Sequence, residues 1–217
     1  MSTPTWLTIN KQSGSGNDQI TVTASSENTG KTARRAIVSG SATNGASDET
    51  VVTQSAKALF VAFNQAAYSI NAGVLLITVS GKTNATSLQF SLASGSHFEI
   101  PSTMSYVVAG EVNARTTSIN KNTGVATPSG DPGATAEYDF SLTLMCPANT
   151  SAVSSVTDTL TVIADNDGNV TSSCTLTHAT ASSTLEMTSA VTLGQAAGST
   201  AQIVITSNDG WTIDVSE

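Results

Sequence analysis

Apolar and polar residues alternate along most of the chain with a period of two, which is the pattern of β-strands. In Ile20–Ala24, Phe140–Leu144 and Leu160–Ala164, apolar residues recur at every second position and are separated mainly by threonine and serine. Alternate residues of a strand point to opposite faces of a sheet, so these runs predict half-buried strands. Ile203–Thr206 predicts a further strand that is apolar on both faces.

Turn signals separate these runs. Gly45, Gly168 and Gly210 each follow Asn or Asp, and such dipeptides favour tight hairpin turns. No window combines helical spacing with capping residues. Residues 58–67 have a weakly helical composition, but Phe60, Val61 and Phe63 fit an entering strand better. The sequence therefore predicts an all-β protein.

Composition limits the possible partners. Charged residues are only 11% of the 217 residues, and the formal net charge is −8. A chain of this length has room for two ordinary domains. An acidic balance argues against nucleic acid, because phosphate binding needs clustered Lys and Arg. The basic pair Arg34 and Arg35 we interpret as the solvated start of a strand.

No segment approaches the roughly 20 apolar residues that span a bilayer. The longest apolar run, Val74–Ile77, fits the interior of a strand, so we expect no membrane partner. The first residues, from Met1 to Trp6, contain neither the basic nor the apolar region of a signal peptide.

The candidate chemical groups are two cysteines, Cys146 and Cys174, and two histidines, His97 and His178. A disulfide requires Cα atoms about 5.5 Å apart, which sequence alone does not establish. Two buried reduced thiols are the alternative that we favour for a protein made in the cytosol. No Cys/His spacing indicates zinc, and no nucleophile motif accompanies either histidine. We therefore expect no enzyme, no metal and no cofactor.

Residues 165–169, with the sequence Asp-Asn-Asp-Gly-Asn, resemble the start of a calcium-binding loop. The EF-hand pattern requires a bidentate Glu at its twelfth position, where this chain has Leu176. Asp and Asn also suit a hairpin turn. We favour the turn over the calcium site.

The two ends of the chain look like two halves of one domain in reversed order. When the C-terminal part is placed before the N-terminal part, the order of features is a two-tryptophan strand pattern, a Ser/Gly turn, an Asn-Thr-Gly turn and two further strands. The residues concerned are Asn208–Val215, Trp6–Ile9, Ser13–Gly16, Asn28–Gly30, Arg34–Ile37 and Val52–Gln54. This series resembles the BACON domain, an immunoglobulin-like sandwich common in Bacteroidetes and their phages.

The resemblance implies that residues 3–57 and 182–217 together form one β-sandwich. Either half alone would expose an apolar face and unpaired strand edges. The residues expected to complete the domain are Ile203, Ile205, Trp211 and Ile213. The halves can close within one chain if the two domains lie side by side, or between copies if the domains lie end to end. We expect closure within the chain, with exchange between copies as the route to a fibre.

Trp6 and Trp211 are the only tryptophans. Exposed tryptophans stack on sugars, and the BACON resemblance implies a proposed carbohydrate-binding role. Both also lie on alternating strands where this type of sandwich buries its aromatic core. We favour core packing, because aromatics dominate the packing energy of small sandwiches.

Residues 58–181 are predicted to form a second sandwich of about seven to nine strands. This part resembles immunoglobulin-like modules of bacterial surface and phage proteins, on the strands Ile77–Gly81 and Leu88–Leu92, the segment His97–Ile100 and the hairpin 157–177. It departs from them at Ser118–Gly133, which is rich in Asn, Thr, Gly and Pro. A loop of this length is usually functional or mobile.

Taken together, the chain resembles a virion protein of crAss-like phages of Bacteroides. The resemblance implies a structural role as an auxiliary capsid, decoration or head-fibre component, with copies of itself or other virion proteins as partners. A host-surface glycan is a further candidate partner. The expected location is the virion, after synthesis in the host cytoplasm. The alternatives are a carbohydrate-binding module of a surface or secreted protein, and an adhesin spacer.

Overall fold

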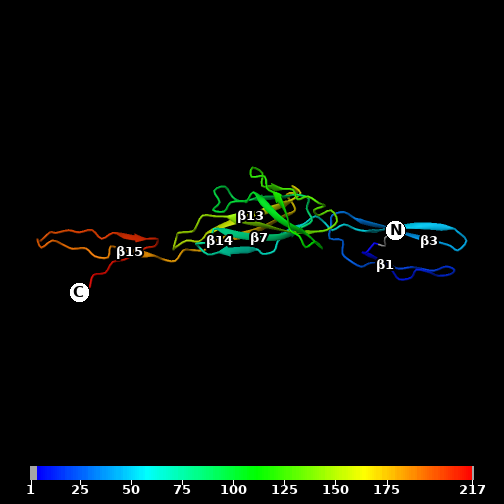
Figure 1. Cartoon of the computed structure of the whole chain (residues 1–217), viewed down its shortest axis with the longest axis horizontal. Helices are drawn as coiled ribbons and strands as arrows, with labels where there is room; N and C mark the ends of the chain where they lie inside the picture. The colour runs from blue at the N-terminus through cyan, green and yellow to red at the C-terminus, as the bar shows by residue number, and fades with distance from the viewer. Residues whose placement is uncertain (1–3, 217) are drawn as a thin grey trace.

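The computed structural model describes residues 4–216 and contains strands but no helix among them. The expected all-β fold is confirmed. In the described residues no helix is long and apolar enough to cross a membrane. Figure 1 shows an elongated molecule, in which a central β-sandwich lies between an N-terminal and a C-terminal segment at opposite ends of the long axis. We call residues 4–57 the N-terminal segment, 58–181 the central domain and 182–216 the C-terminal segment.

The central domain is a sandwich of two five-stranded sheets. The first sheet has the order β10-β9-β12-β7-β5 and the second β11-β8-β13-β14-β6. All neighbours pair antiparallel except β14 and β6. The strands of the first sheet are β10 (Arg115–Ser118), β9 (Thr103–Val108), β12 (Tyr138–Met145), β7 (Leu76–Thr83) and β5 (Val61–Phe63). Those of the second are β11 (Val125–Ala126), β8 (Leu88–Ser91), β13 (Val156–Ala164), β14 (Thr171–His178) and β6 (Ala67–Ile70).

The core lies between these sheets and is built by the alternation seen in the sequence. Along β12, Tyr138, Phe140 and Leu142 are buried, whereas the intervening side chains face outward. The Phe140 ring contacts Phe90 at 5.8 Å between centroids, across the sandwich. The buried cluster contains residues of the central domain only, from Val61 to Leu176. The central domain therefore has a core of its own.

The excursion Ser118–Gly133 is more ordered than expected. It contains β11, which pairs with β8, and a turn in which the Gly124 amide donates to the Asn120 carbonyl at 2.7 Å. Gly124 has a φ of 72°, and a Cβ there would overlap the Phe90 carbonyl. With these short strands included, the structure has ten strands in the central domain, rather than seven to nine.

The N-terminal segment consists of two separate antiparallel pairs. The first pairs β1 (Leu7–Ile9) with β2 (Val22–Ala24), and the second pairs β3 (Arg34–Ser41) with β4 (Ser47–Gln54). Each pair is a two-stranded sheet with two free edges. Such ribbons are marginal in water on their own, because they have no second layer against which to bury an apolar face.

The C-terminal segment contains one such pair, β15 (Leu185–Met187) with β16 (Ile205–Ser207). The segment is attached to the central domain through Asn208, whose side-chain amide donates to the Thr150 carbonyl at 3.2 Å. The residues after Asn208 form no strand in the described chain, although Trp211, Ile213 and Val215 alternate with polar residues. A strand needs a partner, and this stretch has none within the same chain.

The two segments, which the sequence predicts to form one domain, do not pair with each other in this structure: β1-β2, β3-β4 and β15-β16 are separate two-stranded sheets. The N-terminal segment contacts the central domain at Ala134 and Asp165, whereas the C-terminal segment contacts it at Thr150. In Figure 1 the N-terminal segment, with β1 and β3, and the C-terminal segment, with β15, lie at opposite ends of the sandwich. The arrangement is therefore end to end, and closure within one chain stays a prediction that this arrangement does not support.

Candidate functional site

The N-terminal segment carries an exposed apolar face. Ile37 on β3 and Val51 on β4 are direct cross-strand partners and are 63% and 59% exposed. Val22 on β2 and Ile20 just before it are also exposed. Buried apolar residues of this segment are few, Leu7 and Ala36 among them. The face that the sequence predicts to be covered is open in the single chain.

The C-terminal segment is exposed to an even greater extent. Its exposed large apolar side chains come from β15, from the stretch between β15 and β16, and from the residues after β16: Leu185, Met187, Val191, Leu193, Ile203, Val204, Trp211, Ile213 and Val215. Monomeric soluble proteins rarely expose contiguous apolar surface of this kind unless it binds something. Most of the exposed large apolar residues of the described chain belong to these two segments.

The residues expected to complete the first domain all lie in this C-terminal segment. Ile203, Trp211 and Ile213 are about half exposed, and Ile205 is half-buried. Trp6 is half-buried at the other end of the molecule. The two tryptophans therefore share neither a core nor a sugar-binding platform within one chain. Their packing in a common core stays a prediction for the joined domain.

The N-terminal segment is fixed to the central domain by the turn that follows β13. Residues 165–169 form the β13–β14 hairpin connection, as favoured over a calcium loop, with Asp165 and Asn166 at positive φ. The Asp165 carboxylate accepts hydrogen bonds from the Thr86 and Ser87 amides and pairs with Lys31 at 2.5 Å. Burial alone would raise the pKa of Asp165, but Lys31 and these amides outweigh it and hold that pKa below its usual value.

Backbone contacts complete this joint. The amides of Lys31 and Thr32 donate to the carbonyls of Gly133 and Ala134 at 2.8 and 2.9 Å. Gly133 has a φ of 73°, and a Cβ there would overlap the Asn84 carbonyl. The long excursion thus has a structural role in the interdomain joint, which composition alone did not indicate.

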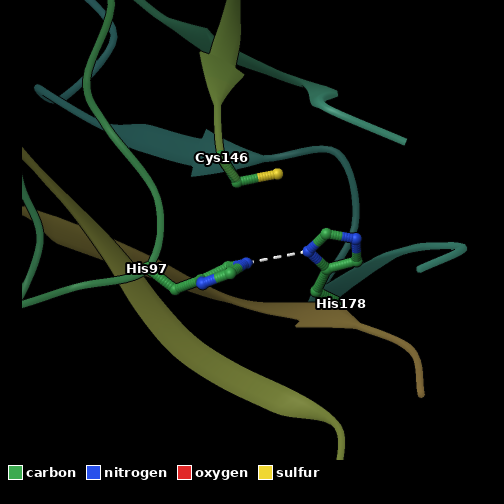
Figure 2. A group of neighbouring side chains, drawn as sticks. All are labelled: His97, Cys146 and His178. Carbon is green, nitrogen blue, oxygen red and sulfur yellow. Dashed lines mark hydrogen bonds between the residues drawn. The ribbon is translucent and has the colours of Figure 1, made fainter. Parts of the chain in front are cut away.

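A second candidate site lies at the end of the sandwich opposite to the joint with the N-terminal segment. His97, Cys146 and His178 bring one imidazole nitrogen each and the thiol sulfur within 4.8 Å of one another. Figure 2 shows the three side chains converging on one point from three different segments. His178 is the last residue of β14, Cys146 follows β12, and His97 lies on the connection between β8 and β9. His178 and Cys146 are buried, and His97 is half-buried.

Hydrogen bonds fix the orientation of the histidines. Nε2 of His178 lies 2.8 Å from the Ala72 carbonyl and 3.1 Å from the Asn71 carbonyl, which only accept. Nε2 therefore carries a proton, and in the neutral ring Nδ1 is the unprotonated nitrogen that faces Nε2 of His97 at 2.8 Å. The Asp158 carboxylate accepts from the His97 amide at 2.9 Å and holds the connection in place.

The thiol of Cys146 donates weakly to the Val74 carbonyl at 3.7 Å. Burial raises the pKa of both cysteine thiols, to about 11 for Cys174. Both cysteines are free and buried, which agrees with the favoured expectation of two reduced thiols. Sequence reasoning missed the cluster because its members are far apart in the chain, the two histidines being 81 residues from each other.

Comparisons with known proteins do not identify the chain. No family model and no curated protein matches it. Among solved structures, the collagen-binding domain of the Erysipelothrix rhusiopathiae surface protein RspB is similar over 75% of this chain, with 4% sequence identity and a TM-score of 0.27. This chain spans 63% of that chain's length. A similarity at this level supports no inference about function.

Proposed function

We propose that this chain is a structural protein that assembles with copies of itself, the C-terminal segment of one molecule completing the N-terminal segment of the next. The observation that carries the proposal is the position of two incomplete, apolar-faced segments at opposite ends of one elongated molecule. Addition of strands from a neighbour would provide hydrogen-bond partners for the free edges and cover the exposed side chains.

Charge supports the pairing of unlike ends. Residues 1–57 carry five of the eight Lys and Arg of the chain, including Arg34 and Arg35 on β3. Residues 182–217 carry four acidic residues and no Lys or Arg. An acidic segment is attracted to the more basic one and repelled by another copy of itself, and this favours N-terminal to C-terminal contacts.

Two modes of association fit these ends. Molecules in line would form an open array, and two antiparallel molecules would close into a dimer with their central domains side by side. The outer faces of the central sheets are lined by hydroxyl groups, including the Thr78–Thr143 and Thr161–Ser173 pairs at 3.0 and 2.9 Å. The exposed cross-strand pair of Leu76 and Met145 lies at one end of the first sheet, so the rest of these faces offers little apolar surface for lateral packing. We therefore favour the linear array, which requires no contact between central domains.

The proposed setting is the surface of a phage virion, as an auxiliary capsid, decoration or head-fibre component. This part of the proposal rests on the resemblance of the end segments to the BACON domain. A glycan-binding role is less well supported, because Trp6 belongs to the N-terminal segment and Trp211 to the C-terminal segment, and these segments lie at opposite ends of the molecule. The identity of the neighbouring genes separates the two: portal and capsid genes support the virion role, and glycoside hydrolase genes support the glycan-binding role.

Self-association is tested by measuring the mass of the full chain in solution over a range of concentrations. We expect a ladder of multiples of the 22.0 kDa chain that shifts to longer species as concentration rises. Because opposite charges steer the ends together, raising the salt concentration should slow association. A single dimeric species would support the antiparallel mode, and a monomer at every concentration would contradict self-association.

A further inference from the structure

The cluster of His97, Cys146 and His178 plays no part in the proposed assembly, which uses only the end segments. The three side chains supply two nitrogen donors and one sulfur donor at one point. We propose that these three residues bind a transition-metal ion, with Zn²⁺ as the ion that the donor set fits best. The proposal is independent of the proposed assembly through the chain ends.

The orientation of His178 supports metal binding. Its Nε2–H is held by the carbonyls of Ala72 and Asn71, so the lone pair on Nδ1 points into the cluster. Metal-bound histidines characteristically donate their second ring N–H to a carbonyl or carboxylate, which fixes the tautomer and the ring plane. Nδ1 of the fully buried His178 is therefore already oriented to bind a metal ion.

The other two donors need only small adjustments. Nε2 of His97 lies 2.8 Å from Nδ1 of His178, and the sulfur of Cys146 lies within 4.8 Å of both. Two nitrogen ligands on one ion at about 2.0–2.1 Å are separated by somewhat more than this, so His97 must move outward slightly. Its half-buried place on a connection between strands allows this movement, whereas the Asp158 bond to its amide keeps the backbone in place.

The donor set selects the class of ion. Imidazole and thiolate suit Zn²⁺ and related transition metals, whereas Mg²⁺ and Ca²⁺ prefer oxygen donors. On binding, Cys146 loses its thiol proton to solvent, and the proton of His97 moves from Nε2 to Nδ1, so that one proton is released in total. Three protein ligands leave a fourth position for water on the side of half-buried His97.

A bound ion would connect the two sheets at the end where the C-terminal segment begins. Cys146 follows a strand of the first sheet, and His178 ends a strand of the second. The next residue, Ala179, donates its amide to the Ile70 carbonyl, and the buried Asn149 side chain donates to the carbonyls of His178 and Ala179. The ion would thus stiffen the base of the connection between the central domain and the C-terminal segment.

The test uses the full chain after treatment with a chelator. Calorimetry should show one Zn²⁺ per chain and no heat from Mg²⁺, and Zn²⁺ should raise the unfolding midpoint. Co²⁺ should produce a thiolate-to-metal charge-transfer band together with visible d–d bands of four-coordinate intensity. Cys146→Ser should abolish the charge-transfer band and weaken Zn²⁺ binding by more than about tenfold, and His97→Gln should weaken it similarly.

Cys174→Ser is the matched control, since Cys174 is also a buried free thiol of the central domain but lies outside the cluster. This variant should bind Zn²⁺ and Co²⁺ like the parent chain. Because His97 is half-buried on a connection, His97→Gln remains informative if Cys146→Ser fails to fold. Failure of the parent chain to bind Zn²⁺, or equal binding by the Cys146 and Cys174 variants, would overturn the proposal.

Discussion

A chain that lacks residues 182–217 is expected to be monomeric at every concentration, while its central domain stays folded. The deletion removes β15, β16 and the exposed apolar residues around them, which are the part proposed to pair with the N-terminal segment of another copy. The central domain should not depend on the deleted residues, because its buried cluster runs from Val61 to Leu176. Mass measurement should show one species, and thermal unfolding should retain a cooperative transition.

Two outcomes would contradict this expectation. If the shortened chain still forms concentration-dependent multiples, the contacts between copies lie elsewhere on the molecule. If the central domain loses its cooperative transition, the C-terminal segment is part of the same folding unit, and the division of the chain after Ala181 is wrong.

Trp211→Ala is expected to weaken self-association more than any other single substitution in the C-terminal segment. Trp211 is the largest apolar side chain of that segment and is 52% exposed in the single chain. Truncation of a fully buried aromatic costs about 3–5 kcal/mol. Because about half of this side chain is already covered, we expect ~1.5–2.5 kcal/mol, or roughly a 10- to 70-fold rise in the dissociation constant.

The matched control for this substitution is Val112→Ala. Val112 is 93% exposed on the central domain, so its truncation removes apolar surface without touching either end segment. The two variants should be compared by sedimentation at equal concentrations. Equal dissociation constants for the Trp211 variant and the parent chain would show that Trp211 stays outside the contact between copies.

The strands of the central domain could be predicted from sequence because each one signals its own burial. The alternation along Phe140–Leu144 predicts a strand with one face packed on a core and the other exposed to water, and β12 has that burial pattern. The hairpin at Gly168 was predicted from its turn residues alone. Both signals are local, and local patterns determine strands and tight turns well.

The ends of the chain show where local patterns stop being sufficient. Trp211, Ile213 and Val215 alternate like a strand, yet they form none here, because pairing depends on a partner that the sequence pattern does not specify. Closure within one chain was expected because tethered segments have a high effective concentration, whereas the structure places the two segments at opposite ends of the molecule. The apolar strand pattern of each end segment could be predicted, but the place of each segment relative to the central domain could not.

The histidine–cysteine cluster was not predictable for a different reason. His97, Cys146 and His178 have no short spacing, because three separate segments bring them together. Cys146 follows β12 in the first sheet and His178 ends β14 in the second, so their proximity depends on how the two sheets pack. Sequence spacing reveals metal ligands only when one turn or hairpin holds them.

The central claim is that the C-terminal segment of one copy binds the N-terminal segment of another. It is tested most directly by mixing two complementary chains, residues 1–181 and residues 58–217, and measuring their masses separately and together. Each has one of the two ends and a complete central domain. The account predicts that each alone is a monomer and that the mixture forms a one-to-one complex and nothing larger. A mixture that stays monomeric, or a shortened chain that associates with itself, would contradict it.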